Sequence, residues 1–142
     1  VGGGYDYEFG WTTTIPSNAF RDMSKLTSVV IPEGITSIGP YAFYSSSLTS
    51  ISLPSTLTAI TSYCFYNCNG LTSIVIPEGT TTIGYRAFYI CGNLAAITVP
   101  DTVTAIDSGA FSKCSSSLIL YCSDDSYAAT YADANGFTHQ QL

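Results

Sequence analysis

Apolar and polar residues alternate over short stretches of the chain, which is the pattern of half-buried β-strands. In one such stretch, Ile74 and Ile76 fall on the same face of a predicted strand, and Pro77 ends it. A turn follows, and a second short β stretch is predicted over 81–83. The segment 86–89 is too short for a free helix, so we expect a one-turn helical segment of 3₁₀ or α type there.

The same pattern recurs along the chain with a nearly constant period. Five phenylalanines, each preceded by a small residue, are separated by 23, 22, 23 and 23 positions: Phe20, Phe43, Phe65, Phe88 and Phe111. Columns of proline, isoleucine and leucine keep the same steps, and the one shorter step arises in the turn 45–47. Because so short a unit cannot bury its own apolar face, we predict a repeat solenoid of mainly short β-strands.

The chain divides into three segments. Residues 10–123 hold five repeats of 22 or 23 residues, at 10–32, 33–54, 55–77, 78–100 and 101–123. Residues 1–9 are expected to form an N-terminal capping strand, because aromatic residues alternate there with acidic residues or glycine. Residues 124–142 are expected to form a C-terminal α-helical cap, in which Ser126 or the residue before it begins a helix that Gly136 ends.

One repeat also resembles the consensus of a known family. The run Leu-Thr-Ser-Ile-x-Ile-Pro-Glu-Gly-x-Thr-x-Ile-Gly-x-x-Ala-Phe at 71–88 is similar to the BspA-like leucine-rich repeats, and the similarity extends over about residues 15–122. The segment 126–136 resembles the helical cap that often closes such arrays. The resemblance implies a leucine-rich-repeat-type solenoid, a secreted or surface-anchored location in bacteria or parasitic protists, and an adhesin without catalytic residues.

The amino-acid composition limits the classes of function that the chain can have. Apolar residues make up 46% of the 142 and charged residues only 10%, which favours one compact folded unit. Four Lys and Arg against ten Asp and Glu give a net charge of −6, so we expect no cationic surface and no nucleic-acid partner. No apolar run reaches the roughly 18 residues that a membrane span needs, and the Gly-rich start resembles neither a signal peptide nor a transit peptide.

The five cysteines follow the repeat rather than a metal-binding pattern. Cys68, Cys91 and Cys114 are 23 residues apart, so we predict a column of small, buried side chains with free thiols, and Cys64 and Cys122 also fall in structural columns of the repeat. The chain contains no C-x-x-C pair and a single histidine, His139. We therefore expect no structural zinc site and no other cofactor.

The acidic residues after the repeat proline leave one metal alternative open. Glu78 and Asp101 should stack on neighbouring units, and a Ca²⁺ ion would relieve the repulsion between their carboxylates. Ser55 interrupts this column, however, and an acidic residue before glycine is also ordinary turn chemistry. We favour turn chemistry and expect no metal.

Catalysis is not expected. Nucleophilic serine chemistry needs a base within hydrogen-bond reach, and the single histidine lies beyond the last repeat. Glycosidase chemistry needs two carboxyl groups across a cleft, whereas these acids lie on one turn ridge or in the caps. The outward strand positions are small and nearly uncharged, so we expect a smooth strand face without a pocket: Ser28, Val30, Ser50, Ser52, Ser73, Val75, Ala96 and Thr98.

Tyrosines beside the repeat phenylalanine are the candidate ligand-binding residues. Three directly follow that phenylalanine and two precede it by two positions, so they should form outward columns: Tyr44, Tyr66 and Tyr89, with Tyr41 and Tyr63. Tyrosine among Ser, Thr, Gly and Asn is typical of adaptable binding surfaces. The alternative interpretation is that these rings only shield the backbone of the turns.

The sequence thus predicts a non-enzymatic, extracellular binding or adhesion module, secreted or on the cell surface. Its repeats would present a surface rich in Tyr, Ser and Thr to a host or cell-surface protein or glycan, without cofactor, nucleic acid or membrane insertion, and we expect a monomer. The alternative is a structural spacer that holds another part of a larger surface protein away from the cell and has no ligand of its own.

Overall fold

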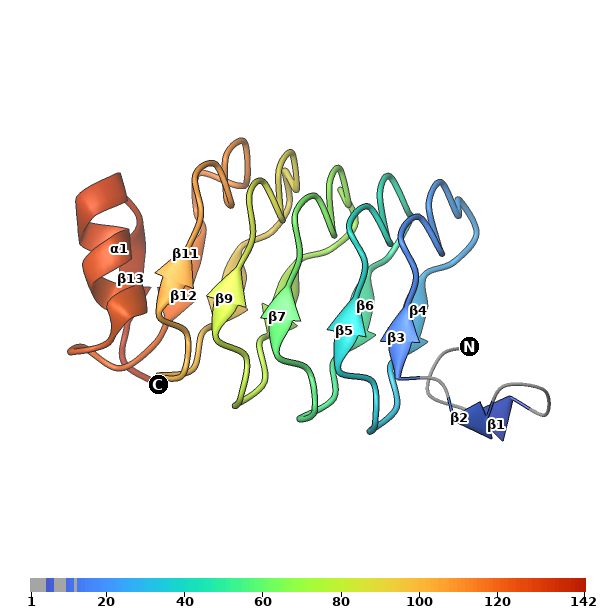
Figure 1. Cartoon of the computed structure of the whole chain (residues 1–142). Coiled ribbons are helices and arrows are strands. Elements are labelled where there is room, and N and C mark those ends of the chain that lie inside the picture. The colour runs from blue at the N-terminus through green and yellow to red at the C-terminus, as the bar shows by residue number, and fades with distance from the viewer. Residues whose placement is uncertain (1–4, 7–9, 12) are drawn as a thin grey trace.

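The computed structural model describes residues 5–6, 10–11 and 13–142, and from residue 13 onward the chain winds as a solenoid (Figure 1). Each turn of the solenoid, called a rung below, adds one strand to each of two faces. The long-strand face consists of β4 (Ser28–Val30), β6 (Ser50–Ser52), β8 (Ser73–Val75), β10 (Ala96–Thr98), β12 (Ile119–Tyr121) and β13 (Thr138–Gln140). The short-strand face consists of β3 (Thr14–Ile15), β5 (Ser37–Ile38), β7 (Ala59–Ile60), β9 (Thr82–Ile83) and β11 (Ala105–Ile106).

Two kinds of turn join the faces. A long turn, such as 39–49, leads from a short strand to the long strand of the same rung, and a short turn, such as 31–36, leads on to the next rung. The long turns lie along the upper edge in Figure 1 and the short turns along the lower edge. The two edges therefore carry different columns of the repeat.

Neighbouring strands pair in parallel and in register, so that each repeated residue lies over its counterpart. Ile97 of β10 pairs with Ile74 of β8 on one side and with Leu120 of β12 on the other. The phenylalanine rings stack through the core with centroids 5.1 to 5.6 Å apart and planes within 12° of each other. The predicted single file of phenylalanines is confirmed, and so is the burial of Ile74 and Ile76.

The strand pairing is interrupted once on each face, at the same rung boundary. Strand β6 pairs with β4 but not with β8, and β5 pairs with β3 but not with β7. We call this boundary, between residues 33–54 and 55–77, the seam. It coincides with the unit that is one residue shorter than its neighbours. Side chains and the backbone of the turns bridge it instead. The Thr61 hydroxyl donates to the Ile38 carbonyl at 2.7 Å, the Thr56 hydroxyl donates to the Ile35 carbonyl at 2.6 Å, and the Thr58 N–H donates to the Thr36 carbonyl at 3.2 Å.

The one-turn helical segment expected over 86–89 is not formed. The Tyr89 N–H does donate back to the Arg86 carbonyl at 3.2 Å, but the Phe88 N–H donates to the next rung at 2.9 Å. A helix needs successive N–H groups to bond within the turn, whereas here they alternate between the turn and the neighbouring rung. Arg86 and Ile90 accordingly take left-handed φ angles of 51° and 61°. The long turns are therefore chains of tight turns.

The C-terminal cap matches the prediction. Helix α1 (Tyr127–Asn135) begins after Ser126, whose side chain accepts from the Ala129 N–H at 3.2 Å, and it ends at Gly136 with a φ of 78°. The Tyr127 hydroxyl accepts from the Ile106 N–H of β11 at 3.3 Å, and so takes up a donor that another rung would otherwise engage. Strand β13 extends the long-strand face beyond β12.

The N-terminal segment differs from the single strand that the sequence predicts. Strands β1 (Tyr5–Asp6) and β2 (Gly10–Trp11) pair antiparallel with each other, and neither contacts another of the described helices or strands. Residues 7–9, which the predicted strand includes, lie outside the described residues. A capping role for residues 1–9 stays a prediction.

Candidate functional site

The long turns direct phenylalanine and tyrosine to opposite sides. Phe43, Phe65 and Phe88 are fully buried, whereas the tyrosines next to them are only half-buried. The residue that follows the phenylalanine points away from the core, and so does the residue two positions before it. The sequence places the tyrosines at these two positions, which puts them on the outer edge of the long turns.

The five predicted tyrosines form one continuous cluster. The Tyr41 and Tyr63 rings stack with centroids 4.7 Å apart and planes within 5°, and the Tyr44 and Tyr66 rings stack at 4.7 Å and 13°. The two columns also meet side by side, at 5.6 Å between Tyr41 and Tyr44. Tyr89 continues the second column, at 5.1 Å from Tyr66. The structure thus brings together all five residues that the sequence singled out.

Three further residues, which the sequence reasoning missed, complete this surface. The Tyr85 ring meets Tyr63 edge to face at 5.6 Å and is 37% exposed. The Arg21 guanidinium carbon lies 4.1 Å from the Tyr44 ring centroid, and that of Arg86 lies 4.5 Å from the Tyr89 centroid. We call the set the Tyr–Arg patch: Arg21, Tyr41, Tyr44, Tyr63, Tyr66, Tyr85, Arg86 and Tyr89.

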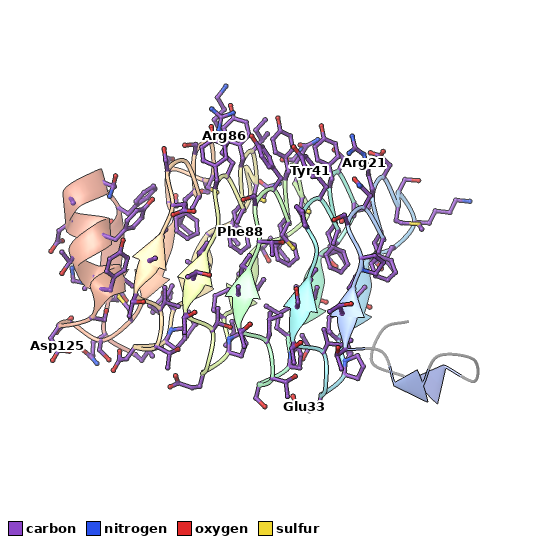
Figure 2. The ribbon with its side chains drawn as sticks, in the orientation of Figure 1. Arg21, Glu33, Tyr41, Arg86, Phe88 and Asp125 are labelled. Carbon is purple, nitrogen blue, oxygen red and sulfur yellow. The ribbon has the colours of Figure 1, made fainter. Side chains whose placement is uncertain are left out.

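A sequence signal for the arginines does exist. Arg21 directly follows Phe20 and so occupies the column of Tyr44, while Arg86 precedes Phe88 by two positions and so occupies the column of Tyr63. Following the columns by position rather than by residue type would have found both. Figure 2 shows Arg21, Tyr41 and Arg86 together along the upper edge of the solenoid.

Charge is distributed unevenly between the two edges. All four Lys and Arg residues of the chain lie on long turns: Arg21, Lys25, Arg86 and Lys113. The acids after the repeat proline lie on short turns, at the opposite edge where Glu33 is labelled in Figure 2. Asp22 and Asp107 are the acids within the long turns, and Asp22 lies 3.5 Å from Arg21. The net charge of −6 therefore conceals a relatively cationic edge, which the composition argument did not foresee.

The backbone of the patch is strained at two tyrosines. Tyr41 and Tyr63 have φ angles of 62° and 58°, in the left-handed region. That region costs a non-glycine residue roughly 1 kcal/mol or more. The equivalent positions on the other rungs are also left-handed: Asn18 at 63°, Arg86 at 51° and Gly109 at 70°. Of these, asparagine and glycine tolerate the conformation best. Partial burial, followed by charge interactions with the neighbouring Tyr85 and Tyr41, raises the pKa of Tyr63.

The cysteine column is structural. The five cysteines are free, and Cys64, Cys68, Cys91 and Cys122 are buried, whereas Cys114, which was predicted to be buried, is partly exposed. Three of the thiols donate hydrogen bonds to phenylalanine carbonyls of the preceding rung: Cys68 to Phe43 at 3.0 Å, Cys91 to Phe65 at 2.9 Å and Cys114 to Phe88 at 3.2 Å. Burial raises the pKa of Cys114 to about 12, which disfavours a reactive thiolate.

On the acidic edge, Glu33 forms hydrogen bonds with the next rung. Glu33 accepts from the Ser55 N–H at 2.8 Å and from its hydroxyl at 2.5 Å, and these two bonds lower the pKa of Glu33. His139 lies 3.1 Å from Asp133 at the C-terminal cap. Within residues 5–6, 10–11 and 13–142, no three His, Cys, Asp or Glu side chains gather closely enough to hold a metal ion.

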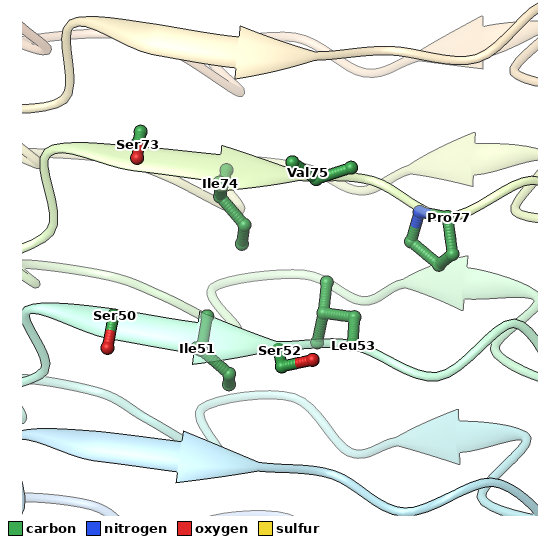
Figure 3. Close-up of a pocket in the computed structure, with 8 residues that line it drawn as sticks. All are labelled: Ser50, Ile51, Ser52, Leu53, Ser73, Ile74, Val75 and Pro77. Atoms are coloured by element: carbon green, nitrogen blue, oxygen red, sulfur yellow. The ribbon is translucent and has the colours of Figure 1, made fainter.

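The long-strand face is not as smooth as the sequence predicts. A hollow of about 320 Å³ opens at the seam between β6 and β8 (Figure 3). Ser50, Ser52, Ser73 and Val75 are among its lining residues, and no charged side chain lines it. It arises where the two strands do not pair, so no single-unit pattern could reveal it. It lies on a different surface from the Tyr–Arg patch.

The fold is a β-solenoid of the leucine-rich-repeat class. It has in-register parallel strands on two faces, which are wound around buried columns of Leu, Ile and Phe. A family model described as the BspA type leucine-rich repeat region matches residues 11–129 in six copies. The chain belongs to this family. The sequence counts five units, one fewer than the six copies that the family model finds.

Solved structures support the assignment. The T. pallidum leucine-rich repeat protein is 30% identical, with a TM-score of 0.77, over 83% of this chain and 56% of that one. A leucine-rich cell surface protein of Faecalibacterium prausnitzii is 34% identical, with a TM-score of 0.76, over 87% and 32%. The pneumococcal vaccine antigen PcpA shares the fold at 18% identity, with a TM-score of 0.70, over 92% of this chain and 39% of that one. No curated protein matches the chain.

These comparisons bear on the role of the chain as well as on its fold. The chain spans about a third to just over half of the solved chains given above. The family includes bacterial surface proteins, which is compatible with a binding or adhesion role. The described part of the chain contains no helix long and apolar enough to cross a membrane.

Proposed function

We propose that the chain is a non-enzymatic, extracellular binding module that presents the Tyr–Arg patch to a protein or glycan ligand at a cell surface. The observation that carries the proposal is the cluster of six tyrosines on one edge of a rigid solenoid. Tyrosine supplies contact area and a hydroxyl group with few rotatable bonds, so a rigid row of such rings binds at a low entropic cost.

The strained backbone supports a role beyond packing. Tyr41 and Tyr63 occupy left-handed positions at which asparagine or glycine would fit with less strain. The left-handed angle belongs to the turn, because all five rungs adopt it at this position, so it is the presence of tyrosine there that favours a role in contacts. The stacked rings restrain one another, so the surface is preorganised before a ligand arrives.

The cell-surface location rests on relatives. One similar solved protein is described as a cell surface protein and another as a vaccine antigen, and both descriptions fit proteins exposed to a host. A spacer function is the alternative, and the partial coverage of those longer chains by this one is the observation that favours it.

An array of immobilised glycans and extracellular-matrix proteins tests the proposal. We expect the chain to bind at least one array component and the triple variant Tyr44→Ser, Tyr66→Ser, Tyr89→Ser to lose that binding by tenfold or more, on the order expected for several aromatic contacts.

Two controls make the test specific. Tyr→Phe changes at the same three positions keep the rings and should retain part of the affinity, which separates ring contacts from hydroxyl contacts. Val30→Ser with Val75→Ser alters exposed residues of the long-strand face and should leave binding unchanged. Undiminished binding by a folded triple serine variant would remove the site assignment, and absence of any binding by the wild type would favour the spacer.

A further inference from the structure

We propose that the Tyr–Arg patch recognises an anionic polysaccharide, whose carboxylate or sulfate groups bind the guanidinium groups of Arg21 and Arg86. This inference rests on the proposed function and names its ligand class. Three observations carry it: the way the rings hold both arginines, the distribution of charge, and the hydrogen bonds that engage most backbone N–H groups in the turns beneath the patch.

Each arginine is held between two tyrosine rings. The Arg21 guanidinium carbon lies 4.1 Å from the Tyr44 centroid and 5.6 Å from that of Tyr41. The Arg86 carbon lies 4.5 Å from the Tyr89 centroid and 5.2 Å from that of Tyr85. Contact with a ring face orients the planar guanidinium and leaves its edge N–H groups to an incoming anion.

The N–H groups of Arg86 are available. Its guanidinium makes no ion pair and no hydrogen bond with any residue that the structure describes. Arg21 is partly engaged, since it donates to the Asn18 amide oxygen at 3.0 Å and lies 3.5 Å from the exposed Asp22 carboxylate. A free guanidinium fork binds carboxylate or sulfate with two parallel, charge-assisted hydrogen bonds.

The charge of the molecule makes such binding local. A chain of net charge −6 repels a polyanion as a whole. The four cationic side chains all lie on the long turns, and the acids after the repeat proline lie on the opposite edge. An anionic polysaccharide therefore finds cationic side chains only along the long turns.

The backbone under the patch favours a glycan over a peptide strand. Extended peptides bind by pairing with free backbone groups at a sheet edge, but the N–H groups of residues 42–47 and 63–67 are already bonded. For example, the Ser45 N–H donates to the Tyr66 carbonyl at 2.8 Å, and the Asn67 N–H donates to the Tyr89 carbonyl at 2.7 Å. The polar groups that the patch offers to a ligand are therefore phenol hydroxyls and guanidinium groups. These groups suit the hydroxyl and acid groups of an anionic sugar chain.

The length of the patch also suits a linear polymer. Arg21 lies on the rung of Phe20 and Arg86 on the rung of Phe88, three rungs further along. At roughly 4.8 Å per rung, the two guanidinium groups are separated by about 14 Å along the solenoid axis. A polymer with repeated anionic groups can engage both at once, which increases affinity through effective concentration.

Titration calorimetry of the full chain at moderate salt tests the inference with four polymers. Polygalacturonate carries carboxylates, heparin carries sulfates as well, dextran is neutral, and polyglutamate is an anionic polypeptide. We expect binding to at least one of the two anionic polysaccharides and a loss of about tenfold in affinity for Arg86→Gln, which is on the order of one charge-assisted interaction. Arg86→Lys keeps the positive charge but loses the planar guanidinium group, so its affinity should lie between those of the wild type and Arg86→Gln.

Lys113→Gln is the matched control. It removes the same charge from the same edge, on a rung whose long turn carries no tyrosine, and should reduce affinity by less than about twofold at moderate salt. An equal loss for both variants would show a diffuse electrostatic effect and overturn the site. Circular dichroism confirms that each variant is folded.

The outcomes separate this inference from the proposed function. Binding to dextran that depends on the tyrosines but not on Arg86 would leave the proposed function standing and overturn the anionic class. Binding to polyglutamate alone would assign a protein ligand and overturn the glycan. Binding to none of the four polymers overturns the inference, whereas anionic binding that survives the triple tyrosine-to-serine change removes both proposals.

Discussion

The phenylalanine and tyrosine columns of the long turns share one period and one backbone but differ in their surroundings. The Phe65 ring is fully buried and stacks at 5.4 and 5.2 Å on the rings before and after it. The adjacent Tyr66 ring stacks on Tyr44 at 4.7 Å, meets Tyr89 at 5.1 Å with planes tilted by 48°, and remains half-exposed. Both columns are regular, so regularity alone does not distinguish scaffold from binding surface. What distinguishes them is whether water or protein covers the outer side of the ring.

The largest expected effect comes from removing a buried ring. Phe65→Ala leaves a cavity between Phe43 and Phe88, and should lower the free energy of unfolding by about 3–5 kcal/mol. Because the rungs support one another, we expect earlier unfolding of the whole solenoid in urea. Phe65→Leu is the control, with a smaller loss because most of the volume is kept. A loss below about 1 kcal/mol for Phe65→Ala would contradict the core assignment.

An intermediate effect is expected in the cysteine column, which faces inward but contributes a hydrogen bond. Cys91→Ala removes the bond from the thiol to the Phe65 carbonyl and leaves a small cavity, so it should cost about 1–2 kcal/mol. Cys91→Ser keeps a donor, and Ser46 already occupies this column on another rung. We therefore expect Cys91→Ser to be closer to the wild type than Cys91→Ala in thermal unfolding. The reverse order would show that apolar filling, rather than the hydrogen bond, is what the column provides.

The sequence predicts the inward columns better than the outward ones. Phe65, Ile74 and the cap at Ser126 follow from spacing, because every unit must repeat a buried contact and each end must be closed. The helical turn at 86–89 was wrong because half of its N–H groups bond to another rung, and no local pattern encodes that partner.

The missed parts of the site have a related cause. Arg21 and Arg86 occupy tyrosine columns with a different residue type, so a search for repeated tyrosine passes over them. Tyr85 lies one position before Arg86, and so outside the column of Tyr63. It joins the patch through the edge-to-face contact of its ring with Tyr63. The hollow between β6 and β8 depends on how two rungs meet at the seam, which is a property of the stack rather than of either unit.

The smallest expected effect on stability comes from an outward ring, and it decides between the two interpretations of the tyrosines. Tyr66 contacts three other rings, with centroids at 4.7, 5.1 and 5.5 Å, but one side of it faces water. Tyr66→Ala should therefore cost about 1 kcal/mol, the order of a single aromatic pair, while it weakens binding to any ligand of the patch.

The informative quantity is the comparison with Phe65→Ala, measured in the same urea titration. If the rings only shielded the turn backbone, removing Tyr66 would expose the N–H groups that bond across rungs, and the loss of stability would approach that of the buried ring. A loss several times smaller, together with reduced binding, means that the phenylalanine column holds the solenoid together and the tyrosine column is free to serve a partner.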